Sequence, residues 1–402
     1  MTEPGSAPLR ILSIAHTAVS RNAGRLRYRP LGKDPTLEIR LIIPQRWHQF
    51  GRWSEADPGD EPGIAVKPLP IRLPRAGPAG WYLHFYPGLG RQVRQFAPNV
   101  IHLWEEPWSV VALHASLLAR RIGAALVLEI DQNILKRLPP PFEAIRRYTL
   151  RCTNLVLARS PMATDVARAC GYVGPSMQIG YGVDKTLFHA GPSRPAMPPL
   201  HIGYVGRLID AKGVDDILSA MSKTSADVRL TVLGEGPHEP ALRAHVAESG
   251  LGDRVTFHPW GGPDDVAKLL RELHALILPT RTTNEIKEQF GRVIIESQAC
   301  GTPVIGSTCG AIPDVVGAGG WIVSERDPDA IAALLDRLST CPEEIAARSV
   351  EGLANVAERF TYDEIAQDLA LAFRIAHSLR TRSTALPFPS ARERAMARPG
   401  QS

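Results

Sequence analysis

The sequence has no apolar run that approaches the length needed to cross a bilayer, and its start, MTEPGSAPLR, lacks the charged-then-apolar pattern of a signal peptide. We therefore expect a cytoplasmic protein. Cysteine is scarce as well, with five residues in 402 and no CxxC or Cys/His spacing. This argues against a disulfide framework and a zinc site, and we interpret the cysteines as small buried hydrophobic residues.

Charge is unevenly distributed along the chain. The net charge is +10 over residues 1–190 and −5 over residues 191–402. A basic first half is compatible with peripheral association with an anionic surface, such as the inner face of a membrane, and equally with charges on a solvated surface. The densest basic cluster, at residues 21–29, has no aromatic interleaving and no nucleic-acid motif, so we expect no nucleic-acid binding. The oligomeric state is not predicted by any feature of the sequence.

Short apolar, β-branched runs alternate with amphipathic stretches through most of the chain. Parallel strands covered on both faces produce this pattern. We expect strands at 9–16, 37–44, 99–104, 125–131, 154–159 and 177–182, and again at 200–208, 228–236, 254–260, 274–280, 302–307 and 320–323. Helices are expected at 110–123, 239–250, 264–273 and 328–338.

The proline-rich segment HAGPSRPAMPPL, at 189–200, divides these strands into two series. The division predicts an α/β protein of two Rossmann-like, doubly wound parallel-sheet domains, residues 1–190 and 191–361, facing a central cleft in which a ligand binds. The amphipathic segment 362–379 is predicted to be helical and is compatible with a helix that crosses back onto the first domain. Residues 380–402 are expected to form a disordered tail.

A glycine and two cations follow the first strand of the second series, in the motif GRLIDAKG. Gly206 allows a tight turn, and Arg207 and Lys212 are spaced so that both can reach one pocket. Arginine grips phosphate oxygens with two hydrogen bonds and lysine acts as a mobile point charge, so the pair suits a diphosphate. The next strand ends in GEGP, where Gly234 can permit close approach to a base or ribose; a plain strand-to-helix turn explains it equally well.

The stretch EQFGRVIIE contains two carboxylates, Glu288 and Glu296, eight positions apart. In a helix their backbones would lie about 12 Å apart, too far for a shared-proton pair. A strand and a polar loop precede the stretch, and we expect a helix to open near Phe290 and Gly291. Helix N-termini attract anions, so the loop glutamate, the helix start and the interior glutamate can contact different parts of one elongated ligand.

In their order and spacing, GRLIDAKG, GEGP, EQFGRVIIE and ACGTPVIGS resemble the retaining glycosyltransferases of glycosyltransferase family 4, which have the GT-B fold. The resemblance implies that Arg207 and Lys212 bind the donor diphosphate, that Glu288 contacts donor-sugar hydroxyls and that Glu296 binds the ribose. Arg207, Lys212 and Glu288 would then be the catalytic residues, acting by charge stabilisation and positioning. The donor-binding set it implies is Gly206, Arg207, Lys212, Gly234, Trp260, Glu288, Gln289, Phe290, Gly291 and Glu296.

The first half, with HLWEEPWSVVALHASLLARRIGA and YGVDKTLF, is similar to the acceptor-binding half of the same family. It departs from the family at two places. A glycine-rich loop is missing after the first strand, where His16 stands, and the usual His-Asp after a later strand is replaced by Asp131 and Gln132. Glu105 follows another strand and can bind acceptor hydroxyls. His16, Glu105, Asp131 and Gln132 are therefore candidate cleft residues of the first domain, although each is also compatible with a structural role.

Together these features predict a bacterial, retaining, hexosyltransferase-like enzyme that moves a sugar from a UDP- or GDP-sugar to a hydroxyl of a saccharide, lipid-linked or natural-product acceptor. Asp327 and Asp329 form an Asp-x-Asp, but with Pro328 between them they fit a helix start better than a metal site, so we expect no required metal or other cofactor. Two alternatives remain: another GT-B enzyme such as a sugar-nucleotide epimerase, and a non-catalytic sugar-nucleotide-binding subunit.

Overall fold

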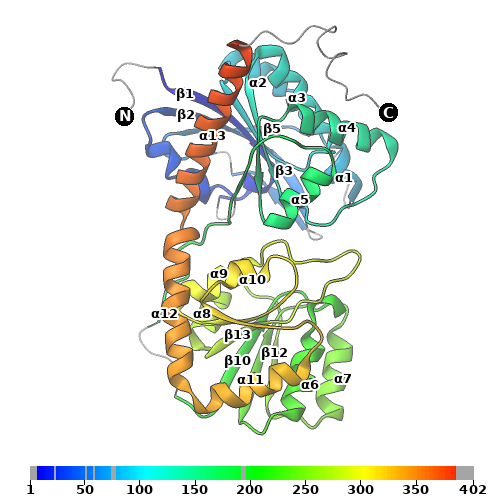
Figure 1. The fold of residues 1–402 in the computed structure, drawn as a ribbon, viewed down its shortest axis with the longest axis vertical. Coiled ribbons are helices and arrows are strands. Elements are labelled where there is room, and N and C mark those ends of the chain that lie inside the picture. Colours follow the sequence, from blue (N-terminus) through cyan, green and yellow to red (C-terminus); the bar gives the residue numbers. More distant parts are fainter. Residues whose placement is uncertain are drawn as a thin grey trace, which may run out of the picture.

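Two parallel sheets, each flanked by helices, organise the chain (Figure 1). The computed structural model describes residues 7–21, 24–49, 52–57, 59–73, 78–191 and 196–385. Within this part of the chain, no helix combines the length and apolar character that a membrane span requires.

The first sheet has seven strands in the order β5-β2-β1-β6-β7-β8-β9, and every pairing in it is parallel. Its strands are β1 (Leu9–Ala15), β2 (Leu37–Pro44), β5 (Ile64–Leu69), β6 (Val100–Trp104), β7 (Ala125–Ile130), β8 (Leu155–Ala158) and β9 (Ser176–Gln178). An antiparallel hairpin of β3 (Arg46–Gln49) and β4 (Arg52–Glu55) follows β2. The central strands β1, β6 and β7 are buried on both faces, as their continuous apolar sequences require.

Helices and short 3-10 turns connect the strands of the first sheet. The helices are α1 (Pro78–Leu83), α2 (Leu89–Phe96), α3 (Val110–Ile122), α4 (Pro140–Cys152) and α5 (Pro161–Ala169). The 3-10 turns are η1 (His16–Val19), η2 (Leu26–Tyr28) and η3 (Leu31–Lys33).

The second sheet has six strands in the order β12-β11-β10-β13-β14-β15, again all parallel. They are β10 (Leu200–Val205), β11 (Val228–Leu233), β12 (Val255–His258), β13 (Ala275–Leu278), β14 (Val304–Ser307) and β15 (Gly320–Val323). The connecting elements are η4 (Asp210–Lys212), α6 (Val214–Lys223), α7 (Glu239–Glu248), α8 (Pro263–Glu272), α9 (Arg292–Ala299), α10 (Ile312–Val316) and α11 (Pro328–Thr340).

The last two helices join the two units. In Figure 1, α12 (Pro342–Arg359) lies along the lower unit, and α13 (Tyr362–Ala385) continues along the upper one. One face of α13 packs into the core of the first sheet, where Phe373 is fully buried and its ring lies 5.3 Å from that of His102. The C-terminal helix therefore covers the sheet formed by the start of the chain.

Every strand segment expected from the sequence contains a strand, and the two parallel sheets match the predicted fold class. Strand β5, the hairpin β3–β4 and several helices, including α4, α6 and α12, were not predicted from the sequence. The helix expected at 362–379 is present but continues to Ala385, so residues 380–385 are helical and do not form part of a tail. Residues 386–402 of the expected tail lie outside the described residues.

One smaller interpretation of the sequence, the helix start at Asp327, is confirmed, and the interpretation of the cysteines as buried residues holds for two of the five. Asp327 is the N-cap of α11, accepting a hydrogen bond from the Ala330 amide at 2.9 Å, and Pro328 is the first helical residue. All five cysteines are free. Only Cys300 and Cys309 are buried, however, and the other three are partly exposed.

Candidate functional site

The loops that follow β10 and β11 lie against each other at the carboxyl edge of the second sheet. Gly206 follows β10 and Gly234 follows the neighbouring strand β11. A β-carbon at Gly234 would lie 1.9 Å from the Gly206 carbonyl oxygen, so a side chain at this position would clash with the backbone. The two glycine motifs seen in the sequence therefore meet in one place.

Lys212 and Glu288, which are 76 positions apart in the sequence, form an ion pair at this edge. The Lys212 Nζ lies 2.6 Å from Glu288 Oε2, and the two side chains are only 16% and 15% exposed. The hydroxyl of the buried Tyr204 donates to the Arg207 carbonyl at 2.9 Å. Its pKa is raised by burial and by the charge of Glu288 and lowered by the charge of Arg207. The exposed Arg207 is therefore close enough to act on the same hydroxyl as Glu288.

The backbone of Glu288 is held from two sides. Its amide donates to Cys309 Sγ at 3.4 Å, and its carbonyl accepts from the Ala311 amide at 3.0 Å. A β-carbon at Gly310, where φ is +61°, would lie 2.1 Å from that carbonyl oxygen. The segment CGAIP after β14 thus packs closely against the backbone of Glu288. The sequence motifs did not predict this role for the segment.

Helix α9 begins at Arg292, four residues after Glu288 and close to the predicted start near Phe290 and Gly291. Gly291 is its N-cap with φ +80°, and the preceding Phe290 is buried, whereas Gln289 is exposed. Glu296 lies inside the helix, with its Oε1 3.6 Å from Arg292 Nη2. Burial raises the pKa of Glu296, and the charge of Arg292 opposes this shift. The free amides at the helix start and the half-buried carboxylate in its second turn can therefore address separate parts of one ligand.

Trp260, a member of the predicted donor-binding set, lies just after β12. Its side chain is 51% exposed, and its amide donates to Glu235 Oε1 at 3.3 Å. Glu235 belongs to the GEGP loop, so Trp260 is tied to the same edge of the sheet as Gly234.

Three neighbouring strands of the first sheet also end in polar residues. His16 follows β1, Glu105 and Glu106 follow β6, and residues 131–133 follow β7. Glu106 Oε1 accepts hydrogen bonds from the amides of Asp131 and Gln132 at 3.0 and 3.1 Å and so holds the loop after β7. Asn133, in this loop, donates to the Glu288 carbonyl at 2.8 Å. The carboxyl edges of the two sheets therefore meet at Glu288.

Two of the predicted first-domain candidates are occupied by protein contacts. Asp131 accepts from Arg159 Nε at 2.7 Å and from the Tyr181 hydroxyl at 3.3 Å. Gln132 is buried, 6% exposed. Tyr181 also stacks edge-on against Phe290, with ring centroids 5.2 Å apart, and so forms a second contact between the two units.

His16 and Glu105, the other two candidates, contact each other. His16 Nδ1 lies 2.7 Å from Glu105 Oε1, and His84 Nε2 lies 3.5 Å from the same oxygen. These three residues have ligand atoms close enough to surround a metal ion, and so do Asp210, Asp215 and His238. In the second group, Asp215 Oδ2 already lies 2.8 Å from His238 Nε2.

Sequence reasoning missed three residues that the structure brings to this region: Asn133, His84 and Tyr181. Asn133 directly follows Asp131 and Gln132, which were predicted to line the cleft, so its position in the sequence could have indicated that it also lies there. Tyr181 opens the segment YGVDKTLF, which resembles the family, but the segment indicated no role for this residue. His84 stands in no recognisable motif, and only tertiary packing identifies it.

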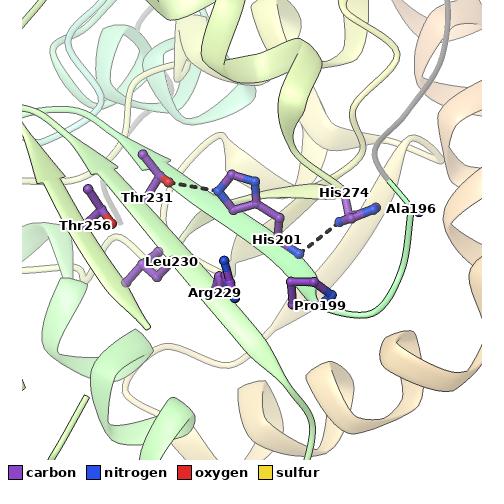
Figure 2. Close-up of a pocket in the computed structure, with 8 residues that line it drawn as sticks. All are labelled: Ala196, Pro199, His201, Arg229, Leu230, Thr231, Thr256 and His274. Carbon is purple, nitrogen blue, oxygen red and sulfur yellow. Dashed lines mark hydrogen bonds between the residues drawn. The ribbon is translucent and has the colours of Figure 1, made fainter. Parts of the chain in front are cut away.

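A separate pocket lies at the opposite edge of the second sheet (Figure 2). It is formed where β10, β11 and β12 begin, with His201 Nε2 2.8 Å from Thr231 Oγ1 and the His201 amide bonded to His274 Nδ1 at 2.9 Å. Ligands of open parallel sheets bind beyond the carboxyl ends of the strands, so this pocket is on the wrong edge for the predicted site.

Residues 190–352 match the family model of the glycosyl transferases group 1. Among curated proteins, the chain is 32% identical over 211 residues to a D-inositol 3-phosphate glycosyltransferase of Segniliparus rotundus, covering 48% of this chain and 46% of that protein. It is 34% identical over 171 residues to the protein of that name from Mycobacterium marinum, covering 39% and 35%. The chain thus spans less than half the length of these relatives.

Similar solved structures cover nearly the whole chain at low identity. Sucrose-phosphate synthase of Thermosynechococcus elongatus has a TM-score of 0.66 at 18% identity, covering 94% of this chain and all of its own. HepE of Anabaena, in complex with UDP and glucose, has a TM-score of 0.65 at 18% identity, covering 91% and 99%. A glycosyltransferase of Rickettsia africae has a TM-score of 0.70 at 14% identity, covering 92% and 98%. These similarities support the fold: two parallel-sheet α/β domains in the GT-B arrangement.

Proposed function

We propose that the chain is a retaining, metal-independent glycosyltransferase that moves a sugar from a nucleoside-diphosphate sugar to an acceptor hydroxyl. The observation that carries this proposal is the Lys212–Glu288 ion pair at the carboxyl edge of a parallel sheet. The pair brings together the motifs GRLIDAKG and EQFGRVIIE, which are both predicted to bind the donor. The match of residues 190–352 to the glycosyl transferases group 1 supports the same assignment.

In the proposed mechanism, departure of the nucleoside diphosphate builds negative charge on its terminal phosphate. Arg207 and Lys212 stabilise that charge, together with the amides at the start of α9. Glu288 contacts hydroxyls of the donor sugar and holds Lys212 in place, and Glu296 contacts the ribose. The acceptor hydroxyl attacks the donor carbon from the face that the phosphate leaves, and the departing phosphate takes the proton of that hydroxyl. In this route to retention, no protein carboxylate has to act as nucleophile.

Both domains take part in the proposed reaction: residues 191–361 hold the donor and residues 1–190 the acceptor. The contacts of Asn133 and Phe290 across the two sheets support this division, because they bring the first domain to the residues proposed to hold the sugar. We place the reaction in the bacterial cytoplasm, where sugar nucleotides are made. We propose UDP-sugars as the first donors to test, because HepE, whose fold is similar, has been solved in complex with UDP and glucose.

A donor screen tests the proposal. The purified chain is incubated with UDP-, GDP- and dTDP-sugars, and nucleotide release is measured with and without EDTA. We expect release from at least one donor, unaffected by EDTA, and a loss of about 100-fold or more in Arg207→Ala and Glu288→Ala, by analogy with removal of other charge-stabilising groups. Arg243→Ala and Glu285→Ala serve as exposed controls, the latter from the same loop as Glu288.

Three other outcomes of this screen would contradict part of the proposal. Binding without release from any donor would indicate a non-catalytic subunit, and conversion of the donor sugar without transfer would indicate an epimerase. Full activity in both Arg207→Ala and Glu288→Ala would refute the site. Proton NMR of the first product determines whether the configuration at the transferred carbon is retained.

A further inference from the structure

Five segments of the first domain converge on a polar cluster that donor binding does not explain. His16 follows β1, Trp47 lies in β3, Trp81 lies in α1, His84 follows α1 and Glu105 follows β6. Glu105 and His84 are 4% and 0% exposed, whereas His16 remains partly exposed. We refer to these five residues as the His16 cluster.

The contact with Glu105 determines which ring nitrogen of His16 faces the carboxylate and which is left for a ligand. Burial raises the pKa of Glu105, but the neighbouring His16 and His84 lower it to about 2 overall, so the carboxyl group is ionised at neutral pH. A carboxylate only accepts hydrogen bonds, so the 2.7 Å contact places a proton on His16 Nδ1. The other ring nitrogen, Nε2, has no hydrogen-bond partner within the part of the chain that the structure describes. It is therefore available to a hydroxyl group, which can both donate and accept a hydrogen bond.

Aromatic rings surround this imidazole. The buried Trp47 lies with its ring centroid 4.6 Å from that of His16 and restricts the ring on one side. Trp81 lies 6.3 Å from His16 and is 45% exposed. An accessible indole beside an imidazole and a carboxylate suits a ligand with an apolar ring face and hydroxyl groups at its edge.

Two more polar groups at the cluster have no hydrogen-bond partner among the described residues: Trp47 Nε1 and the Tyr86 hydroxyl. Tyr86 is fully buried, and its ring lies 6.0 Å from that of His84. Buried polar groups are nearly always satisfied by protein, water or ligand, so these two are further candidates to meet a polar ligand.

The His16 cluster lies at the same edge of the first sheet as the loop that reaches Glu288. The strands β1, β6 and β7 are consecutive neighbours in the sheet, spaced about 4.8 Å apart. Asn133, in the loop after β7, contacts the Glu288 carbonyl. Glu105 and His16 therefore follow strands about 5 and 10 Å from the strand whose loop reaches the donor side.

A metal ion fits this arrangement less well than a hydroxyl group. The ligand atoms of His16, His84 and Glu105 are close enough to one another to surround an ion. However, the 2.7 Å contact between His16 Nδ1 and Glu105 requires a proton where a metal would need a bare nitrogen. The chemistry of the cluster therefore favours a neutral, hydroxyl-bearing ligand.

We propose that the His16 cluster is the acceptor site, and that it takes a polyhydroxylated ring, either a pyranoside or a cyclitol. His16 Nε2 forms a hydrogen bond with an acceptor hydroxyl, Glu105 orients the imidazole, and the ring of the ligand packs against Trp81. This inference rests on the proposed sugar transfer, because it assigns the substrate class of the first domain.

NMR of the full chain with saturating UDP tests the inference. The probes are methyl α-glucopyranoside, methyl α-mannopyranoside and myo-inositol, each titrated to high millimolar concentration. The two methyl glycosides represent pyranosides, and myo-inositol represents cyclitols. We expect at least one probe to shift the His16 Nε2 and Trp81 indole resonances. His16→Gln and Glu105→Gln should each weaken the affinity for that probe about tenfold, because each variant loses one hydrogen bond. Trp81→Ala should weaken it similarly.

The controls separate this inference from the proposed donor chemistry. His189→Gln and Trp53→Ala, both at exposed positions, should leave probe affinity unchanged. UDP affinity, measured by calorimetry, should be the same in every variant, which also shows that each variant is folded. Probe binding with no donor turnover would refute the proposed function and leave a saccharide site.

Three results would overturn the acceptor site. One is the absence of any shift at His16 or Trp81 with all three probes while the donor is turned over. Another is unchanged probe affinity in His16→Gln and Glu105→Gln. The third is tight, stoichiometric Zn²⁺ binding that Glu105→Gln abolishes, because it would identify the cluster as a metal site.

Discussion

Glu288 shows how much of the candidate site depends on a single, firmly held residue. Its side chain pairs with Lys212, while its backbone is bonded to Cys309, Ala311 and Asn133. These partners come from the loops after β10, β14 and β7, so changes in any of them move the same carboxylate. Positioning to within a fraction of an ångström is what catalysis by charge stabilisation requires.

Glu106 should make stability depend on pH. Burial, and then the charge of Asp131, raise its pKa to about 8. The folded protein thus binds a proton more tightly than the unfolded chain, whose carboxyl group titrates near 4.5. The free energy of unfolding is therefore expected to fall as pH rises from about 4.5 to about 8, by roughly 1.4 kcal/mol for each unit of pKa difference.

The variant Glu106→Gln isolates this effect, because it keeps the acceptor for the amides of Asp131 and Gln132 but does not titrate. In urea unfolding at a series of pH values, the wild type should lose stability relative to the variant between pH 4.5 and 8. Parallel curves over this range would show that Glu106 is not the titrating group. Glu38→Gln, at an exposed position, should follow the wild type throughout.

At the scale of elements, the loop that carries Lys212 is held by an arginine from the next strand. Arg281 follows β13 and bonds Asp216 through Nε and Nη2, at 2.9 and 2.7 Å. Its Nη1 lies 3.0 Å from Asp210 Oδ1, and its amide donates to the Ala211 carbonyl at 2.8 Å. The short turn η4, which ends at Lys212, is therefore fixed to the strand that leads to Glu288.

Arg281→Lys should weaken catalysis without removing a charge, because lysine cannot reproduce the bidentate bond to Asp216. A displaced η4 moves Lys212, and small displacements of a catalytic group cost on the order of 10- to 100-fold in rate. Nucleotide release at varied donor concentration measures this change. Arg243→Lys, an exposed control on α7, should leave the kinetics unchanged. Unchanged kinetics in Arg281→Lys would show that the contacts of Arg281 with Asp210 and Asp216 contribute only to stability.

For the molecule as a whole, the path of the last two helices couples the two domains. Helix α12 belongs to the second unit, while α13 buries an apolar face against the first sheet. The residues of that face are Ile365, Ala366, Leu369, Ala370, Ala372, Phe373 and Ala376. The first domain therefore depends for its core on the chain's own C-terminal region, and the chain crosses between the units twice.

Phe373→Ala should destabilise the first domain by about 3–5 kcal/mol, the usual cost of removing a fully buried phenylalanine. Urea unfolding followed by tryptophan fluorescence measures the change. Leu371→Ala provides a matched control two residues away, because Leu371 is 49% exposed and its loss should cost less than about 0.5 kcal/mol. Equal effects of the two substitutions would mean that α13 does not dock in solution as it does here.

Much of the second domain followed from local pattern. Its six strands were predicted, and so was the helix start between Glu288 and Glu296, because buried parallel strands and helix N-termini have characteristic sequences. The first domain was harder. Strand β5 contains Lys67 and Pro68, and hairpin β3–β4 is polar, so neither matches the pattern of a buried strand.

The sequence by itself determined the two-sheet α/β architecture and the donor motif, since periodicity and short glycine-containing motifs are local properties. It could not determine which distant side chains meet. Lys212 and Glu288 are 76 positions apart, Asn133 and Glu288 are 155, and His16 and Glu105 are 89. Only the tertiary structure decided these pairs, because hydrogen bonds depend on distances that arise when parallel strands align their carboxyl ends.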